Sequence, residues 1–388
     1  MKLLRAEHKR LLKALYGAEG EDYGRVLEAI SLLLETSVLP HSKEFDEAAG
    51  GIAPGRRALF DQGICRLAFP SAEGTSLPFG VYAMAMELVA SADAPTAMSI
   101  GIHNTVAEGV FRFGNDDQRK RVFTDLVEGR RLGAFALTEP SSGSDARAMK
   151  TTAVKNGSNY TLDGSKMFIT NAGDADIYLV FAASAKGHSA FIVDKSTPGL
   201  SVGKDIPKLG MRGSRTAEVR FSDCSVPAGN LVGKEGEAFE YVKFLLSGSR
   251  IVMGSICVGI ALTAYRKALE YSKQRSLFNG ELSELQMTRE KIADMRTELS
   301  SSRLLCAYAS RLKDAGVDFS SEAAQAKVAA TESAVRVCDR AIQLFGGYGY
   351  TDPDVHRHWR DARLLTIGEG ASEVLRMLIA GKELAETR

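Results

Sequence analysis

The chain has 388 residues, 45% of them hydrophobic and 25% charged, which is the ordinary composition of a globular protein. Its length exceeds what one small hydrophobic core supports and favours two or three domains. Forty-nine Lys and Arg residues against 48 Asp and Glu residues give a net charge of +1. General nucleic-acid binding needs a basic surface, so we expect no nucleic-acid partner.

The N-terminus and the cysteines bear on where the protein works. The five cysteines show no C-x-x-C pair and no metal-ligand spacing with His, so we expect no metal and a reducing, cytoplasmic compartment. We find no window with the roughly 18 apolar residues that span a bilayer, and expect no membrane span. The basic, amphipathic N-terminus is typical of a transit peptide or a surface helix. Acidic residues follow at once, from Glu7 onward, which favours the surface helix.

The first part of the chain, from Met1 to about Gly129, has a helical pattern. Apolar residues recur three and four positions apart in Tyr23–Leu34 and Val81–Ala90, so they share one helix face. After Gly236 the pattern returns in four long stretches with short connections, which predicts a bundle. These stretches are Ile251–Gln274, Glu284–Lys313, Ser321–Phe345 and Ala371–Glu386.

Between Arg131 and about Asn230, short runs rich in β-branched and aromatic residues predict strands. The clearest runs are Leu132–Phe135, Ile177–Ala182, Ala190–Val193 and Ala217–Phe221. Asn156-Gly157 and Asp163-Gly164 flank Tyr160–Leu162, and both dipeptides favour hairpin turns in an antiparallel sheet.

These patterns together predict an α+β multi-domain fold. We expect residues 1–129 to form an N-terminal all-α domain, residues 130–235 a middle antiparallel, barrel-like β domain, and residues 236–388 a C-terminal four-helix bundle.

Two segments of the β region are candidates for binding a flat polar ring. Residues 136–145 read A-L-T-E-P-S-S-G-S-D; the backbone N–H groups of such a loop can bind anions or heterocycle oxygens, and a solvated loop is the alternative. Residues 166–173 read K-M-F-I-T-N-A-G, where Phe168 and Thr170 would face the same side of a strand end. A packed Phe and a strand-capping Thr explain this segment equally well.

Three segments of the helical region also combine glycine with polar residues. Arg275 lies where a helix should end; it could clamp a phosphate or stabilise the helix C-terminus. Residues 341–350 read A-I-Q-L-F-G-G-Y-G-Y; the glycines allow close approach to a ligand, and a helix C-cap explains one of the three. Glu369 lies between two glycines in I-G-E-G-A-S-E. Its carboxylate is either a first-turn partner of the helix dipole or a base in a pocket.

Six motifs in one order and spacing resemble the acyl-CoA dehydrogenase flavoenzymes. They are A-L-T-E-P-S-S-G-S-D, K-M-F-I-T-N-A-G, R-S-L-F followed by Q after seven residues, Q-L-F-G-G-Y-G-Y, R-D-A-R and E-G-A-S-E, and the match runs from about residue 25 to the C-terminus. The resemblance implies the helical–β–helical architecture, FAD as cofactor, an acyl-CoA substrate, electron-transfer flavoprotein as electron acceptor, and a homotetramer.

The resemblance also implies a role for individual residues. Glu369 matches the catalytic base. The residues that it assigns to FAD are Phe135, Leu137, Thr138, Gly143, Ser144, Phe168, Ile169, Thr170, Arg275, Phe278, Gln286, Gln343, Gly346, Gly347, Ala371 and Glu373. Of these, Arg275, Phe278 and Gln286 would meet the FAD of a neighbouring subunit. The residues that it assigns to the substrate are Ser144, Ser247, Arg250, Gly368, Gly370 and Asp93.

The implied reaction explains why these residue types are needed. The α-hydrogen of a thioester is a very weak acid, so its removal requires stabilisation of the enolate oxygen. By the resemblance, the Glu369 backbone N–H and a ribityl hydroxyl of FAD donate to that oxygen. Burial among acyl carbons would raise the basicity of Glu369, and the β-hydrogen would leave as hydride to the flavin. The product is a trans-2-enoyl-CoA.

Several positions depart from the usual family pattern. Gly368 stands where straight-chain enzymes usually carry tyrosine, which points to branched or cyclic acyl groups. Ser249 occupies the position where some relatives keep their base, which leaves Glu369 as the sole base of the pattern. Ala371 replaces a common threonine near FAD. Asp93 would lie near the acyl pocket, as in relatives that act on cyclic acyl groups; a solvent-side helix acid is the alternative.

Other function classes remain open at this point. A flavin oxidase of the same fold would pass its electrons to O2, and an oxygen electrode would detect it. A nitroalkane-oxidising relative is disfavoured, because those enzymes use Asp where this chain has Glu369. A nucleic-acid-binding relative is disfavoured by the net charge of +1, and a dehydrogenase of acyl-carrier-protein substrates would differ only at the CoA-facing surface.

Overall fold

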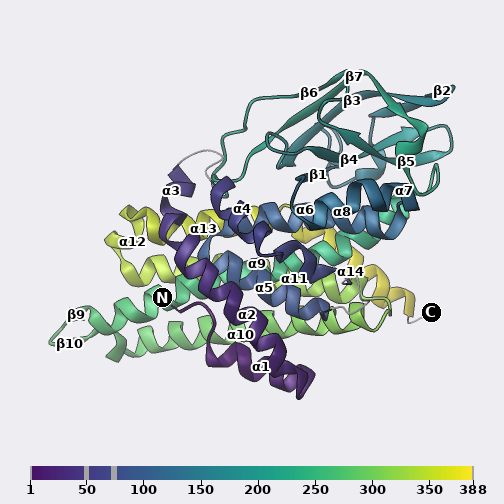
Figure 1. Cartoon of the computed structure of the whole chain (residues 1–388). Coiled ribbons are helices and arrows are strands. Elements are labelled where there is room, and N and C mark those ends of the chain that lie inside the picture. The colour runs from purple at the N-terminus through teal and green to yellow at the C-terminus, as the bar shows by residue number, and fades with distance from the viewer. Residues whose placement is uncertain (1, 48–51, 71–76, 387–388) are drawn as a thin grey trace.

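The computed structural model describes residues 2–47, 52–70 and 77–386. An N-terminal helical part, a central sheet and a C-terminal helical part follow one another along the chain, and the sheet sits on one side of the helices (Figure 1). This order is the predicted one. Eight α-helices precede the sheet in the described part of the chain: α1 (Ala6–Tyr16), α2 (Glu19–Ser37), α3 (Ser42–Glu47), α4 (Ala53–Asp61), α5 (Phe79–Ala92), α6 (Ala94–Phe113), α7 (Asp116–Gln118) and α8 (Thr124–Val127).

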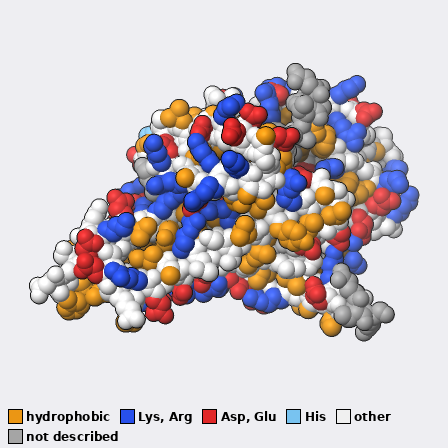
Figure 2. Space-filling model, turned by 90° about the horizontal axis from the view of Figure 1, so that it is seen from below, with side chains coloured by type: hydrophobic (Ala, Val, Ile, Leu, Met, Phe, Trp, Pro, Cys, Tyr) orange, Lys and Arg blue, Asp and Glu red, His pale blue; other side chains and the backbone are white. Residues whose placement is uncertain are grey.

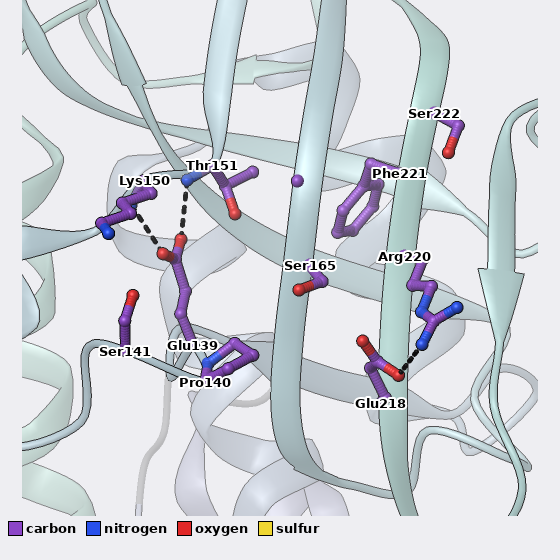
Figure 3. Close-up of a pocket in the computed structure, with 11 residues that line it drawn as sticks. Glu139, Pro140, Ser141, Lys150, Thr151, Ser165, Glu218, Arg220, Phe221 and Ser222 are labelled. Atoms are coloured by element: carbon purple, nitrogen blue, oxygen red, sulfur yellow. Dashed lines mark hydrogen bonds and ion pairs between the residues drawn. The ribbon is translucent and has the colours of Figure 1, made fainter.

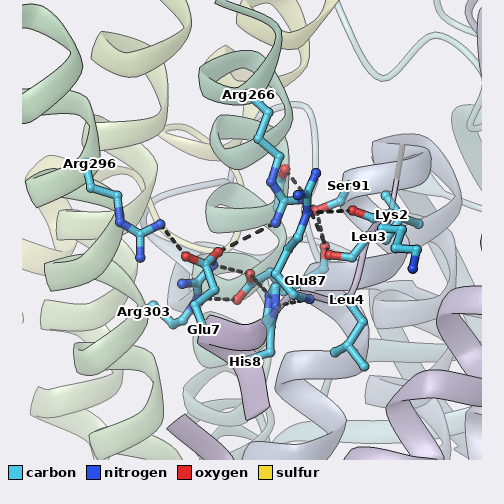
Figure 4. Close-up of polar contacts among 12 residues, drawn as sticks. Lys2, Leu3, Leu4, Glu7, His8, Glu87, Ser91, Arg266, Arg296 and Arg303 are labelled. Atoms are coloured by element: carbon cyan, nitrogen blue, oxygen red, sulfur yellow. Dashed lines mark hydrogen bonds and ion pairs between the residues drawn. The ribbon is translucent and has the colours of Figure 1, made fainter. Parts of the chain in front are cut away.

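The N-terminal segment forms a helix, α1, that a buried polar network fastens to the bundle (Figure 4). Glu87 of α5 is 2% exposed and accepts two hydrogen bonds from Arg303, at 2.6 and 2.9 Å. His8 of α1 approaches the same carboxylate to 2.9 Å. Burial would raise the pKa of Glu87, but Arg303 and His8 outweigh it and hold that pKa well below its usual range. The expected surface helix therefore buries one side, which carries His8 and Leu12.

The middle domain is an eight-stranded sheet with the strand order β6-β7-β3-β2-β4-β5-β8, and β1 pairs with β4. Most neighbours are antiparallel as predicted, while β4 pairs in parallel with β1 and with β2. The strands are β1 (Gly133–Ala136), β2 (Thr152–Asn156), β3 (Asn159–Thr170), β4 (Ile177–Ser184), β5 (Gly187–Asp194), β6 (Leu200–Val202), β7 (Thr216–Pro227) and β8 (Leu231–Val232).

One predicted hairpin is present and one is not. The turn after Asn156 joins β2 to β3. Asp163-Gly164 makes no turn: it lies inside β3, where the pairing with β7 shifts register between Leu162 and Gly164. Gly164 has φ +144° and its Cβ position lies 2.6 Å from Thr151 Oγ1, so glycine here serves a bulge and a close crossing of strands.

The sheet buries both of its faces, because its residues alternate sides along each strand. Ile177, Leu179 and Phe181 of β4 join the core that the helices share. Tyr178 and Val180 face the second core, which lies within the middle domain. One core is therefore continuous from the sheet into the bundle, and this fixes the sheet against α6.

The described C-terminal part contains the four predicted helices and two that the sequence did not predict, α12 and α13. The helices are α9 (Ala238–Gln274), α10 (Gln286–Asp314), α11 (Ser320–Phe345), α12 (Gly347–Thr351), α13 (Pro353–Leu365) and α14 (Ser372–Glu386), with a hairpin of β9 (Ser276–Leu277) and β10 (Gly280–Glu281) between α9 and α10. Helix α9 packs against α5, α6, α10, α11 and α13. It is central to the bundle.

Helix α9 is also long and apolar enough to cross a membrane, with a mean hydropathy of 1.7 over its most apolar stretch. The expectation that the chain holds no such stretch is therefore wrong by length and composition. Within the fold, 94% of that stretch is buried, and its central position accounts for its apolar composition.

Helix α13 joins the helical part to the middle domain. Asp361 accepts a hydrogen bond from the backbone N–H of Met211, in the loop before β7. A Cβ at Gly210 would lie 2.1 Å from the carbonyl oxygen of Arg360, so only glycine permits this approach. The segment that carries Glu369 begins directly after this joint.

Candidate active site

A buried ion pair fastens the small-residue loop after β1 to strand β3. Lys166 is fully buried, and its Nζ donates to Glu139 Oε1 at 2.7 Å and to the Leu137 carbonyl at 3.0 Å. The Glu139 carboxylate also accepts from the backbone N–H groups of Lys150 and Thr151 (Figure 3). Burial lowers the pKa of Lys166 to about 8. Burial would raise the pKa of Glu139, but these hydrogen bonds outweigh it and lower that pKa. The loop is therefore anchored, not a freely solvated segment.

A hollow of about 450 Å³ lies beside this pair (Figure 3). Pro140 and Ser141 of the loop, Ser165 of β3 and the ion pair of Arg220 with Glu218 border it. None of the predicted cofactor or substrate residues lines it, so we give it no part in the site.

Strand β3 presents an aromatic ring to solvent at a bulge. Phe168 is 63% exposed and has φ +60°, a conformation that costs a non-glycine residue about 1–2 kcal/mol. The pairing with β7 shifts between Lys166 and Ile169, which interrupts the regular alternation that we expected between Phe168 and Thr170. Ile169 is 2% exposed and packs in the middle-domain core. An exposed ring on a strained backbone is typical of a ligand-binding position.

The end of β3 is fixed by residues that the sequence analysis did not single out. The Asn171 amide donates to the carbonyls of Ser99 and Gly133, both at 3.0 Å, and the Ser99 hydroxyl donates to Asn171 Oδ1 at 2.6 Å. Asn171 also has φ +69°, which Asn tolerates better than most residues. The one signal for this role in the sequence was an Asn directly after a strand. Its hydrogen-bond partner on α6, Ser99, lies 72 residues away.

The other predicted residues of the loop differ in exposure. Phe135 is 9% exposed and its ring packs against Phe181 at a centroid distance of 5.0 Å, so its side chain belongs to the core. Thr138 is half-buried, and Gly143 and Ser144 are exposed. The part of the loop that is free to meet a ligand is therefore its second half.

Glu369 lies in a tight turn between α13 and α14. Glu369 has φ +55° and Gly370 has φ +97°, so two successive residues adopt left-handed conformations. The Arg250 Nε, from α9, donates to the Glu369 carbonyl at 3.3 Å, and the Lys327 Nζ, from α11, donates to the Gly370 carbonyl at 2.7 Å. Two helices of the bundle thus hold the turn that presents this carboxylate.

The environment of the Glu369 carboxylate suits a base. The residue is half-buried, and its Oε2 is buried with no hydrogen-bond partner among the described residues. Burial raises the pKa of Glu369; the Ser249 hydroxyl and the charges of Arg250 and Lys327 act in the opposite direction without outweighing it. Ser249 Oγ likewise has no partner of normal geometry in the described chain. A buried, unpartnered carboxylate oxygen is available to accept a proton.

The remaining predicted substrate residues on the helices fall into two groups. Gly368, with a φ outside the left-handed region, is open: a Cβ there would have only the Leu364 carbonyl oxygen within 4 Å, at 3.9 Å. Arg250 is 8% exposed and lies against the Glu369 turn, and burial lowers the pKa of Arg250. Ser247 is 4% exposed, and its hydroxyl donates to the Lys243 carbonyl within α9 at 2.8 Å. Gly368 and Arg250 therefore adjoin Glu369.

Asp93 is the N-cap of α6 and does not face solvent. It is 3% exposed, and its Oδ2 accepts from the Thr96 backbone N–H at 2.9 Å. The alternative of a solvent-side helix acid is wrong, because Asp93 sits at the buried junction of α5 and α6. Capping explains an aspartate at this position.

A third group of predicted residues lies at the end of the bundle remote from the sheet (Figure 1). The ends of α9 and α11 adjoin there, with the Tyr271 and Phe345 rings stacked at 4.3 Å. The predicted residues of this end are exposed: Arg275, Phe278, Gln286, Gln343, Gly346 and Gly347. Phe278 is 84% exposed and has φ +53°. The tip of the hairpin therefore exposes an aromatic ring to solvent, as β3 does with Phe168.

Ala371 and Glu373 lie just beyond the Glu369 turn. Ala371 is half-buried, and Glu373 is exposed in the first turn of α14.

Comparison with known proteins decides the family. Three family models match in order: "Acyl-CoA dehydrogenase, N-terminal domain" over residues 21–130, the "middle domain" over 134–224 and the "C-terminal domain" over 236–384. The human mitochondrial "Short-chain specific acyl-CoA dehydrogenase" is 41% identical over 322 residues, which cover 81% of this chain and 78% of that protein. The chain belongs to the acyl-CoA dehydrogenase family.

Solved structures agree with this assignment. The butyryl-CoA dehydrogenase of Megasphaera elsdenii superposes with a TM-score of 0.90 at 37% identity, covering 94% of this chain and 97% of that one. A glutaryl-CoA dehydrogenase of Mycobacterium smegmatis in complex with FADH2 has a TM-score of 0.88 at 25% identity, covering 94% of each chain. This acyl-CoA dehydrogenase is a flavoprotein oxidoreductase by family, and its three-part fold is the predicted one. The boundaries predicted at residues 129/130 and 235/236 stay a prediction.

Proposed function

We propose that this acyl-CoA dehydrogenase converts a short acyl-CoA thioester to the trans-2-enoyl-CoA, with Glu369 as the base that removes the α-proton. The observation that carries the proposal is the buried Glu369 Oε2, which lacks a partner among the described residues. Burial also raises the pKa of this carboxyl, which makes it a stronger base than one in water. The relatives described as short-chain and butyryl-CoA dehydrogenases support a short acyl chain.

In this proposal the chain binds FAD between the loop after β1 and the bulge of β3. The exposed Phe168 ring would pack on the isoalloxazine, and Thr170 would donate toward its N5 side. The exposed loop around Gly143 and Ser144 offers N–H groups to phosphate or pantetheine oxygens. Bound FAD would accept the β-hydrogen as hydride, and electron-transfer flavoprotein would then take the electrons. The M. smegmatis structure with FADH2 supports this cofactor.

We also propose that the enzyme is a homotetramer in which FAD is shared across subunits. The exposed side chains at the far end of the bundle, Arg275 and Phe278 among them, would reach the cofactor of a neighbour. Apolar residues exposed along α10 support burial against another copy: Met287 is 68%, Leu304 56% and Tyr308 55% exposed. Figure 2 shows hydrophobic side chains interspersed with Lys and Arg on the face seen from below.

The five free, buried cysteines fit the reducing cytoplasmic compartment that we expected.

The open space at Gly368 supports a preference for acyl groups that are wide near the thioester. A tyrosine ring there would press on the carbons next to the carbonyl, whereas glycine leaves that volume to methyl-branched or cyclic substrates. One methylene well or poorly accommodated changes kcat/KM by about 10–200-fold. Because Gly368 lies outside the left-handed region, Gly368→Tyr is compatible with the backbone and should shift the preference toward straight chains.

A panel of acyl-CoAs mixed anaerobically with the purified enzyme tests these proposals. Butyryl-, isobutyryl-, isovaleryl- and cyclohexanecarboxyl-CoA are each scored for the rate of flavin bleaching. Bleaching by any of them, with the enoyl-CoA as product, supports the reaction; a protein that cannot be loaded with FAD would refute it. If butyryl-CoA clearly outperforms every branched and cyclic compound, the substrate proposal alone is wrong. In that case Gly368 is needed for the backbone conformation and not to make room for the acyl group.

A further inference from the structure

Lys327 is a fully buried lysine in the middle of α11. Its side chain is 0% exposed, and its Nζ makes one hydrogen bond, to the Gly370 carbonyl at 2.7 Å. Within the described ranges, no Asp or Glu oxygen lies within the 4.0 Å of an ion pair with it. Burial of an ammonium group without a paired carboxylate is costly, and an apolar side chain would fill the same space without that penalty.

The turn that Lys327 contacts is one that needs support. Glu369 carries a Cβ at φ +55°, which costs about 1–2 kcal/mol and persists only where surrounding contacts fix it. The carbonyls of Glu369 and Gly370 are held by Arg250 and Lys327, respectively. Because these cations come from α9 and α11, two helices of the bundle hold the turn.

The same ammonium group also acts on the Glu369 carboxylate. The charged or titratable groups that act on Lys327 are Arg250 and Cys257 from α9, Glu332 from α11 and Glu369 from the turn. The groups that favour ionised Glu369 are the Ser249 hydroxyl, Arg250 and Lys327. If the Lys327 charge were lost, Arg250 would remain as the one cation among those three groups.

We propose that Lys327 is a positioning residue for catalysis: it holds the Gly370 carbonyl so that the Glu369 carboxylate keeps its orientation, and its charge favours the ionised carboxylate that accepts the proton. This inference rests on the proposed role of Glu369 as base. Lys327 would act through the Gly370 carbonyl and through its charge, without contact to the reacting atoms.

Three variants of the FAD-loaded enzyme test the proposal. Lys327→Met keeps the length of the side chain and removes its charge, and Lys327→Arg keeps the charge. Lys267→Met is the matched control, because Lys267 is a half-buried lysine of α9 whose partner is Asp354. For each variant the rate of anaerobic flavin reduction by butyryl-CoA, or by the best substrate of the panel, is measured across pH. FAD content and thermal unfolding are measured in parallel.

For Lys327→Met we expect flavin reduction to fall by about 10–10²-fold, the usual effect of a misplaced catalytic group. Its acid limb should move to higher pH, because a carboxyl that has lost a neighbouring cation is easier to protonate. Lys327→Arg should recover the wild-type acid limb, and Lys267→Met should keep it. A role confined to stability would lower the melting temperature and leave the acid limb in place.

Two results would overturn the inference. One is a Lys327→Met enzyme with the wild-type acid limb and rate. If Lys327→Met fails to hold FAD, Lys327→Gln takes its place, because glutamine keeps a hydrogen-bond donor without the charge. The second overturning result is then a Lys327→Gln enzyme with the wild-type acid limb and rate. Failure of the proposed function can be told apart from failure of this inference. If Glu369 were not the base, Glu369→Gln would still bleach the flavin. A Glu369→Gln enzyme without activity, beside an unchanged Lys327→Met, leaves Glu369 as base and removes only Lys327.

Discussion

The two glycines beside Glu369 should respond very differently to alanine. At Gly370, φ is +97° and a Cβ would lie 3.0 Å from Leu375 Cδ2. Leu375 is fully buried and cannot move freely. The left-handed conformation costs alanine about 1–2 kcal/mol, and the crowding adds about 1–3 kcal/mol, as overpacking does. We therefore expect Gly370→Ala to destabilise the protein by about 2–5 kcal/mol if the turn holds its shape.

If the turn relaxes instead, the strain falls and the Glu369 carboxylate moves. A displacement of about 1 Å at a reacting group lowers the rate about 10²-fold. Gly368→Ala is the matched control, because its Cβ meets only one atom within 4 Å, at 3.9 Å. It should be neutral or stabilise by about 0.4–1 kcal/mol.

Chemical denaturation and single-turnover flavin reduction on the two variants separate these outcomes. Gly370→Ala should lose stability, rate or both, while Gly368→Ala keeps the stability and position of the turn. Equal stability of the two variants, with the rate of Gly370→Ala unchanged, would contradict this expectation, since it would mean that neither the backbone conformation nor the crowding at Gly370 constrains the turn.

Two further predictions concern buried charges. Lys166→Met would leave the Glu139 carboxylate buried without its cation, at a cost of about 3–5 kcal/mol. Thermal unfolding should show this loss of stability, and absorbance should show a lower flavin content. Unchanged values would mean that the loop keeps its conformation without the ion pair. Burial raises the pKa of Asp361 from 3.8 to about 7, so the folded state keeps a proton that the unfolded chain releases, and stability falls as pH rises between these values. Asp361→Asn has no proton to lose, so its melting temperature relative to wild type should rise over that window; parallel curves would contradict the shift.

Much of the fold could be predicted because its elements have strong local patterns. Helices α9, α10 and α11 are long stretches without proline, and strand β4 is a short run of apolar, β-branched and aromatic residues that is buried on both faces. Helix α13 escaped prediction because Arg and His occupy much of its sequence, and its Arg357 and His358 are buried. Asp163-Gly164 looked like a turn, but the crossing of Thr151 requires glycine inside the strand.

The residues of the candidate site could be predicted only where a motif carries them. Glu369 stands in such a motif, and so does Phe168, although the strained backbone that exposes Phe168 was not foreseen. Lys327 and Asn171 are different, because each acts on a segment distant in sequence: Lys327 reaches Gly370 across 43 residues. Neither residue stands out in a helical or strand pattern, since their roles depend on which elements the fold brings together.

Anaerobic flavin reduction by the preferred acyl-CoA in Glu369→Gln tests whether Glu369 is the base. Glutamine keeps the size and polarity of the side chain but cannot accept the α-proton, so the variant should retain FAD and bind ligand. We predict that its rate of flavin bleaching falls by at least about 10²–10⁴-fold, the range typical of a lost general base. Bleaching at a rate near that of the wild type would contradict the assignment of Glu369 as the base, and with it the proposed mechanism.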